Sequence, residues 1–103
     1  MKEDKFYYKD GTTSSEYDYS KTLHRTDGPA AEYADGSKDW YVDGKRHRVD
    51  GPAIKFASGH KEWWLDDAFY TKKAFRKLVR DIKQLPLALK LTDPREWVRN
   101  YEN

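Results

Sequence analysis

The 103-residue chain contains no cysteine, only one methionine and few aliphatic residues. The absence of cysteine excludes disulfide bonds, thiolate metal sites and cysteine nucleophiles. No apolar run approaches the roughly 18 residues that a membrane span needs, and the opening sequence, MKEDKFYYKDG, is too charged for a signal peptide. The sequence therefore predicts a single cytoplasmic domain over residues 1–103 that has no membrane partner.

Aromatic residues take the place of the missing aliphatic ones. Seven Leu, two Ile, four Val and four Phe are few for a folded core, but four Trp and eight Tyr add large apolar surfaces. Each aromatic side chain can bury roughly 150–250 Å². The net charge of +2 is also far below that of typical disordered chains. We therefore expect a folded domain with an aromatic-rich core.

Residues 21–43 and 44–66 align without a gap as two copies of a 23-residue repeat. Both copies contain HRxDGPA, then a Gly, a Lys, an acidic residue, an aromatic pair and an Asp. Asp-Gly favours two-residue hairpin turns because glycine tolerates positive φ. Since the segments between turns have strand length, each repeat is expected to form three strands of an antiparallel meander. The expected turns are Asp27-Gly28, Asp35-Gly36, Asp43-Gly44, Asp50-Gly51, Ser58-Gly59 and Asp66-Asp67.

Alternation along the expected strands predicts which side chains face the core. The inner positions should be Ala31, Tyr33, Trp40 and Val42, with their repeat equivalents Ile54, Phe56, Trp63 and Leu65. Tyr41 and Trp64 share an outward position, and Tyr17 and Tyr19 alternate in an N-terminal hairpin arm over residues 1–20. Outward aromatic residues are typical of binding interfaces, but they also pack across strands, and both alternatives stay open.

The pattern changes to a helical period after Thr71, which is a suitable N-cap. Apolar residues recur at helical spacing up to Ile82, and Pro86 ends the helix. An extended crossing should follow over residues 85–91, and a second helix should begin at Asp93. The expected fold class is α+β, with a curled antiparallel β-meander of about six to eight short strands covered by one or two C-terminal helices over residues 67–103.

The HRxDGPA motif, followed by a Gly turn and an aromatic pair, resembles the MORN-like hairpin-repeat small proteins of bacteriophages, large DNA viruses and bacteria. The resemblance covers about residues 21–70 and, more loosely, residues 6–11, where FYYKDG echoes DWYVDG. It implies a curled antiparallel sheet and no particular activity. MORN repeats proper have a YxGxxxxGxxxG-type spacing that this chain lacks, so the lipid or scaffold roles of some of them transfer poorly.

The predicted first helix has a basic face opposite its apolar stripe. Three of its i,i+4 pairs are like-charged, which costs roughly 0.2–0.5 kcal/mol each. Such a face can be a solvated surface, a site for an acidic protein surface, or a site for nucleic-acid phosphates. Its basic residues are Lys72, Lys73, Arg76, Lys77, Arg80 and Lys83.

The histidines and carboxylates give little sign of metal binding or catalysis. His24 and His47 occupy the same repeat position, where the histidine should bond a turn backbone and the following arginine should meet the aspartate of the motif. The sequence has no metal-ligand spacing, phosphate-binding loop or nucleophile elbow. We expect no cofactor, no metal and no enzymatic activity.

The leading hypothesis is a small non-enzymatic protein-binding module, phage-encoded by resemblance, that modulates or inhibits a host protein such as a defence factor. Its partner would have an acidic surface, and it would act in the host cytoplasm. One alternative is a nucleic-acid-binding protein that uses the basic helix 72–83. Another is a structural or self-assembling protein that forms homo-oligomers through its sheet edges. The expected partner-binding residues are those of the basic face together with Tyr41 and Trp64.

Overall fold

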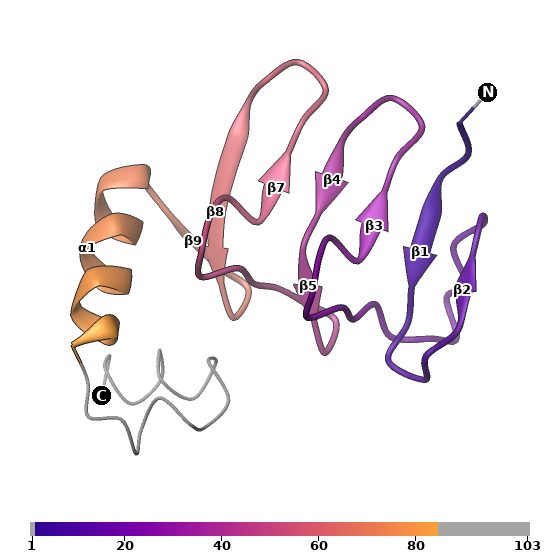
Figure 1. The fold of residues 1–103 in the computed structure, drawn as a ribbon, viewed down its shortest axis with the longest axis horizontal. Coiled ribbons are helices and arrows are strands. Elements are labelled where there is room, and N and C mark those ends of the chain that lie inside the picture. Colours follow the sequence, from indigo (N-terminus) through magenta and orange to yellow (C-terminus); the bar gives the residue numbers. More distant parts are fainter. Residues whose placement is uncertain (1, 85–103) are drawn as a thin grey trace.

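The computed structural model describes residues 2–84 and has the predicted α+β class, with an antiparallel sheet followed by one helix (Figure 1). Seven strands form the main sheet in the order β2-β1-β3-β4-β7-β8-β9, and β5 and β6 form a separate two-stranded sheet. The elements are β1 (Lys5–Tyr7), β2 (Thr13–Ser14), β3 (Ala31–Glu32), β4 (Lys38–Asp39), β5 (Tyr41–Val42), β6 (Lys45–Arg46), β7 (Ile54–Lys55), β8 (Lys61–Leu65), β9 (Ala68–Tyr70) and α1 (Lys72–Lys83).

The hairpins β3–β4 and β7–β8 stand side by side with their turns at the same end of the sheet (Figure 1). In the first turn, the Tyr33 amide donates to the Ser37 carbonyl, and the Gly36 amide donates to the Tyr33 carbonyl. The second turn repeats both bonds 23 residues later. Because Gly36 has a φ of +95° and Asp35 does not have a positive φ, this loop is a three-residue type I turn closed by a glycine bulge, and the prediction of two-residue turns was wrong here. It fixes which residues pair across the hairpin.

Two further predicted turns, Asp43-Gly44 between β5 and β6 and Asp66-Asp67 between β8 and β9, lie at the opposite end of the sheet (Figure 1). Both central residues have positive φ in each turn, as a type I′ turn requires. The His24 Nδ1 accepts a hydrogen bond from the Asp43 amide at 3.0 Å, and the His47 Nδ1 accepts one from the Asp66 amide at 3.0 Å. The prediction that the motif histidines bond turn backbones is therefore confirmed.

Asp27-Gly28 and Asp50-Gly51 do not form hairpin turns, and the expectation of positive φ at their glycines was wrong. Each glycine instead lies against the arginine of its own motif. A Cβ built on Gly51 would come within 2.9 Å of the Arg48 guanidinium carbon, and Gly28 stands in the same relation to Arg25. A side chain at either glycine would push the guanidinium out of its present position, because the backbone approaches it closely.

Each motif arginine lies between its own loop and an aromatic ring. The Arg48 Nε donates to the Asp50 carboxylate at 2.9 Å, its Nη1 donates to the Pro52 carbonyl at 3.1 Å, and its guanidinium lies 3.9 Å from the centre of the Trp40 ring. Arg25 makes the equivalent bonds in the first repeat and lies 4.0 Å from the centre of the Tyr7 ring. The predicted arginine–aspartate contact is confirmed, and Tyr7 occupies the position of Trp40, as the echo between FYYKDG and DWYVDG indicated.

The predicted inner face was wrong for half of its residues. Ala31 pairs with Asp39, so both project from one face, and Tyr41 packs against the core on that face. Trp40 projects from the other side, where it meets Arg48 and Lys55. The glycine-bulge loop sets this register, and a shift of one residue moves every side chain of a strand to the opposite face. The two faces therefore carry separate cores.

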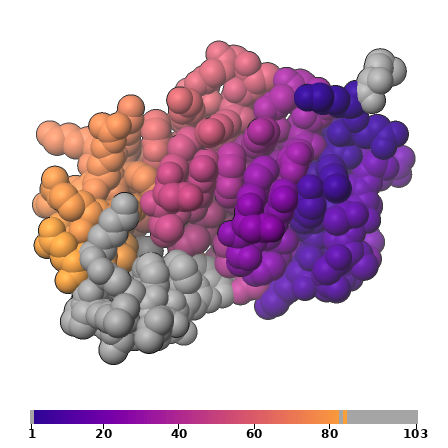
Figure 2. Space-filling model, viewed as in Figure 1, coloured from indigo at the N-terminus to yellow at the C-terminus, as the bar shows by residue number. Residues whose placement is uncertain are grey.

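The core on the face of Ala31 is built from Phe6, Tyr8, Leu23, Ala30 and Ala31, with Tyr33 and Tyr41 packed against it. The core on the other face is built from Leu65, Phe75, Leu78, Val79 and Ile82, with Val49, Trp63 and Tyr70 at its margin. Trp40 and Trp63 are both half-buried, and Phe56 is exposed. The hairpins follow one another as neighbouring bands from β1 to α1 in the space-filling view (Figure 2).

The helix α1 closes the end of the sheet beside β8 and β9, far from the N-terminus (Figure 1). The Thr71 hydroxyl accepts a hydrogen bond from the Ala74 amide, which confirms the predicted N-cap. Within residues 2–84, no helix has the length and apolar character that a membrane crossing requires. The crossing expected over residues 85–91 and the helix expected from Asp93 lie outside the described residues.

Substitution of Gly59 by Ala should destabilise the protein through the backbone alone. Gly59 has a φ of +96°, and nothing lies within 4 Å of a Cβ built there. The left-handed conformation costs an alanine roughly 1–2 kcal/mol, and urea unfolding should show a loss of that size. Ala57→Ser, in the same exposed turn, is the control and should change the stability by less than about 0.5 kcal/mol.

Substitution of Arg48 by Met should remove both hydrogen bonds and the stacking on Trp40 while it keeps the aliphatic stem. We expect a loss of about 1–2 kcal/mol of stability. Arg25→Met should cost more, because Arg25 also donates to the Glu32 carboxylate at 2.9 Å. Equal or reversed losses in thermal unfolding would contradict this account of the two loops.

Candidate functional site

The basic residues of α1 lie on the surface of the helix that faces away from the core. Lys72, Lys73, Arg76, Lys77 and Arg80 are all exposed. The first turn of the helix contains no acidic residue, and among the described residues no salt bridge involves any of these five cations. Lys83 belongs to α1, but its side chain lies outside the described part of the chain. Five of the predicted site residues are therefore gathered on one helix.

Trp63 is the last aromatic residue at the strand position that Tyr7 and Trp40 also occupy. This indole occupies the position that Trp40 has in the first repeat. Trp40 is covered by Arg48 of the following HRxDGP loop, but the sequence has no third such loop to cover Trp63. The α1 residue Lys72 lies near it instead, with its Nζ 5.8 Å from the ring centre. The indole is consequently left beside an open groove.

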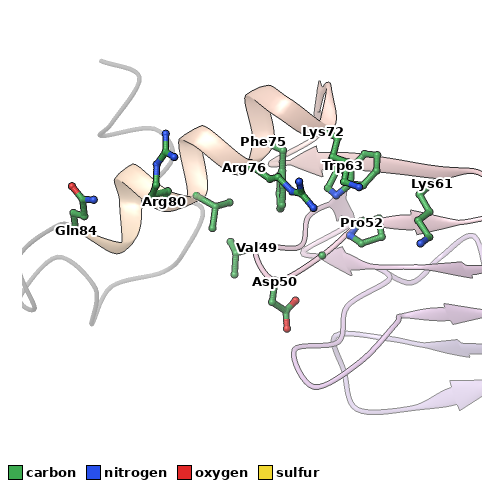
Figure 3. Close-up of a pocket in the computed structure, with 12 residues that line it drawn as sticks. Val49, Asp50, Pro52, Lys61, Trp63, Lys72, Phe75, Arg76, Arg80 and Gln84 are labelled. Carbon is green, nitrogen blue, oxygen red and sulfur yellow. The ribbon is translucent and has the colours of Figure 1, made fainter.

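The groove lies between α1 and the last HRxDGP loop and has a volume of about 620 Å³ (Figure 3). The side chains that converge on it come from three separate parts of the chain: the loop, β8 and the helix. Its apolar lining is Val49, Pro52, Trp63, Phe75 and Val79, and its cationic lining is Lys61, Lys72, Arg76 and Arg80.

The electrostatic character of this groove is positive. Four cations line it, and the one carboxylate among the described lining residues is that of Asp50. Asp50 is already engaged, since it accepts a hydrogen bond from Arg48 at 2.9 Å. An aromatic and aliphatic floor with a cationic rim can hold an apolar side chain that is flanked by negative charges.

Tyr41 and Trp64 do not line the groove, and both are half-buried rather than exposed. Trp64 lies 4.5 Å from the Arg46 guanidinium and meets Phe69 edge to face, and its Nε1 donates to Glu62 at 3.1 Å. Tyr41 packs against the core around Phe6. The exposed large aromatics within the described range are Tyr17, Tyr19, Phe56 and Phe69.

Sequence reasoning missed the residues that the sheet contributes to the site. Lys61, Trp63 and the loop around Val49 lie outside the helix, and the expected face assignment placed Trp63 in a buried core. A signal was nevertheless present, because Trp63 is the second member of a repeated position whose covering arginine is not repeated a third time. Within residues 2–84, no group of three or more His, Asp or Glu side chains could hold a metal ion.

Substitution of Lys73 by Glu should stabilise the protein slightly. A carboxylate in the first helical turn interacts favourably with the helix dipole, and it would also form an opposite-charge i,i+4 pair with Lys77. We expect a gain of about 0.5–1 kcal/mol at low salt, measured by urea unfolding. A loss of stability would show that Lys73 has a structural partner.

Comparisons with known proteins identify no relative of the chain. No protein-family model, curated protein or solved structure matches it. The resemblance to MORN-like hairpin-repeat proteins thus stays a prediction from the HRxDGPA motif, and function has to be inferred from the described side chains.

Proposed function

We propose that this protein is a small non-enzymatic binding module that attaches to an acidic surface of another protein through the groove beside α1. The observation that carries this proposal is that four cations line one groove together with the half-buried indole of Trp63. These cations come from β8 and α1 and have no carboxylate partner among the described residues. A partner carboxylate would relieve their mutual repulsion on binding.

The apolar floor favours a protein partner over nucleic acid. Val49, Pro52 and Trp63 are half-buried and offer contacts for an aliphatic or aromatic side chain, which is how hot-spot residues of protein interfaces are seated. A phosphate backbone would use the cations but not this floor. Nucleic-acid binding through the same basic helix is therefore the competing outcome of the test.

The resemblance to phage and viral repeat proteins supports a further step, in which the partner is a host protein. A rigid domain that occupies an acidic surface can block that surface from its normal ligand. On this proposal the protein acts in the host cytoplasm as an inhibitor or modulator, and a host defence factor is one such target.

Arg76→Glu combined with Arg80→Glu should abolish partner binding without loss of folding. Both side chains are exposed and line the groove, so the change reverses its charge and leaves the core intact. The measurement is affinity purification from nuclease-treated bacterial lysate, with circular dichroism to verify folding. Retention of a partner by wild-type protein and its loss in the double variant is the expected result.

Lys2→Glu combined with Lys45→Glu is the matched control, because it makes the same change in net charge on exposed residues outside the groove. It should retain the partner. Circular dichroism is measured for this variant as well, because the Lys45 Nζ lies 3.8 Å from the Asp66 carboxylate. Loss of the partner on nuclease treatment would show that the partner is duplex nucleic acid and not a protein. A plot of the logarithm of the binding constant against the logarithm of the salt concentration should then have a slope near −3.6, as expected for about four contacted phosphates. Equal binding by the Arg76/Arg80 variant and wild type would refute the proposed function.

A further inference from the structure

A row of lysines crosses three adjacent strands on the face of the sheet that carries Trp40 and Trp63. Lys38 of β4 pairs with Lys55 of β7, and Lys55 pairs with Lys61 of β8. Directly opposed residues of antiparallel strands project from the same face. With strands about 4.8 Å apart, the row spans about 10 Å. Like charges placed directly opposite one another destabilise a sheet, so stability alone does not explain the row.

The first repeat shows how the same position can be neutralised. Glu32 is the repeat equivalent of Lys55. Its carboxylate accepts hydrogen bonds from Arg25 at 2.9 Å and from the Tyr7 hydroxyl at 3.1 Å. In the second repeat, Arg48 keeps its bonds to Asp50 and Pro52 but lies beside Lys55 in place of a carboxylate. The two repeats therefore share a framework and differ in charge at one position.

The electrostatic effect of this difference is visible at Lys55. Burial lowers the pKa of its ammonium group, and the nearby charges of Arg48, Lys61 and Lys38 lower that pKa further. Among the described residues, none of the three lysines forms a salt bridge. A negatively charged ligand on this face would remove the repulsion.

The row is continuous with the groove beside α1, because Lys61 belongs to both. The neighbouring aromatic ring of Trp40 is already covered, by the Arg48 guanidinium at 3.9 Å and by the Lys55 Nζ at 5.6 Å. Single-stranded nucleic acids bind such faces by stacking successive bases on aromatic rings. Of the two indoles on this face, Trp40 is not free to do so, and Trp63 alone would offer one stacking position. Carboxylates of a protein need no stacking surface.

We propose that Lys38, Lys55 and Lys61 form a second contact surface, which binds carboxylates of an acidic protein segment whose apolar side chain enters the groove. The inference rests on the proposed function. It extends the binding surface from the groove to a continuous strip over β4, β7, β8 and α1. The recognised segment would carry an aliphatic or aromatic anchor with several Asp or Glu residues on one side of it, extending over about 10 Å.

Lys55→Glu tests this surface, because it recreates the charge of the first repeat. It should stabilise the fold by placing a carboxylate beside Lys38, Lys61 and Arg48, so reduced binding cannot result from unfolding. The probe is a fluorescein-labelled 16-residue peptide of Glu and Asp residues beside a central Leu-Leu pair, and fluorescence anisotropy at low salt measures its dissociation constant. We expect affinity to fall about tenfold or more, with a smaller fall for Lys55→Gln and no change for Lys2→Glu.

The outcomes separate this inference from the proposed function. If Lys55→Glu raises the melting temperature but binds the peptide as wild type does, the second surface is wrong, and the function stands if the Arg76/Arg80 variant still loses the peptide. If neither variant loses the peptide, or wild type does not bind it, the proposed function fails. Tighter binding of a 20-nucleotide oligo-dT, weakened by Lys55→Glu, would assign the row to nucleic acid instead.

Discussion

The arrangement on which the rest of this structure depends is the stacking of an arginine between an aromatic ring and an Asp-Gly-Pro loop. The guanidinium donates to the aspartate carboxylate and to the proline carbonyl, and its flat face lies on Tyr7 or Trp40. Each such unit ties a loop to a segment that precedes it in the chain, by 18 residues for Arg25 and Tyr7 and by 8 residues for Arg48 and Trp40. This is a way for a chain with few aliphatic residues to build a core, since arginine and aromatic rings bury area together while their polar groups stay paired.

The same arrangement explains where the groove lies. The strand position occupied by Tyr7 and Trp40 occurs again at Trp63, but α1 follows in place of another HRxDGP loop. A helix is a straight rod of larger radius than an extended loop, and it contacts Leu65 through Phe75, Leu78, Val79 and Ile82 without seating a guanidinium on the indole. The groove is thus the place where two kinds of secondary structure meet with different surface shapes.

The sequence was sufficient for the parts of this fold that are governed by local rules. The helix with its Thr71 cap, the type I′ turns and the histidine–turn bonds follow from periodicity, positive φ and side-chain chemistry. The strand faces did not follow, because the pairing of Ala31 with Asp39 depends on the number of residues in a bulged turn. The role of Gly51 could not be predicted either, because its close approach to Arg48 does not show in the spacing of residues along the sequence. Lys61 and Trp63 lie on the face of the groove because the second hairpin, β7–β8, has the equivalent register.

A comparison of the two repeats distinguishes the residues that the fold needs in both from a position whose charge it does not determine. Arginine, aspartate, glycine and proline occur at the same places in both loops and make the same bonds, so the framework is needed twice. Glu32 and Lys55 occupy one position of that framework with opposite charges. Glu32 stabilises its repeat through Arg25, whereas Lys55 adds repulsion against Arg48, Lys38 and Lys61. Because the framework accommodates either charge, the fold does not require a lysine at this position, and the acidic partner that we propose would give Lys55 a function.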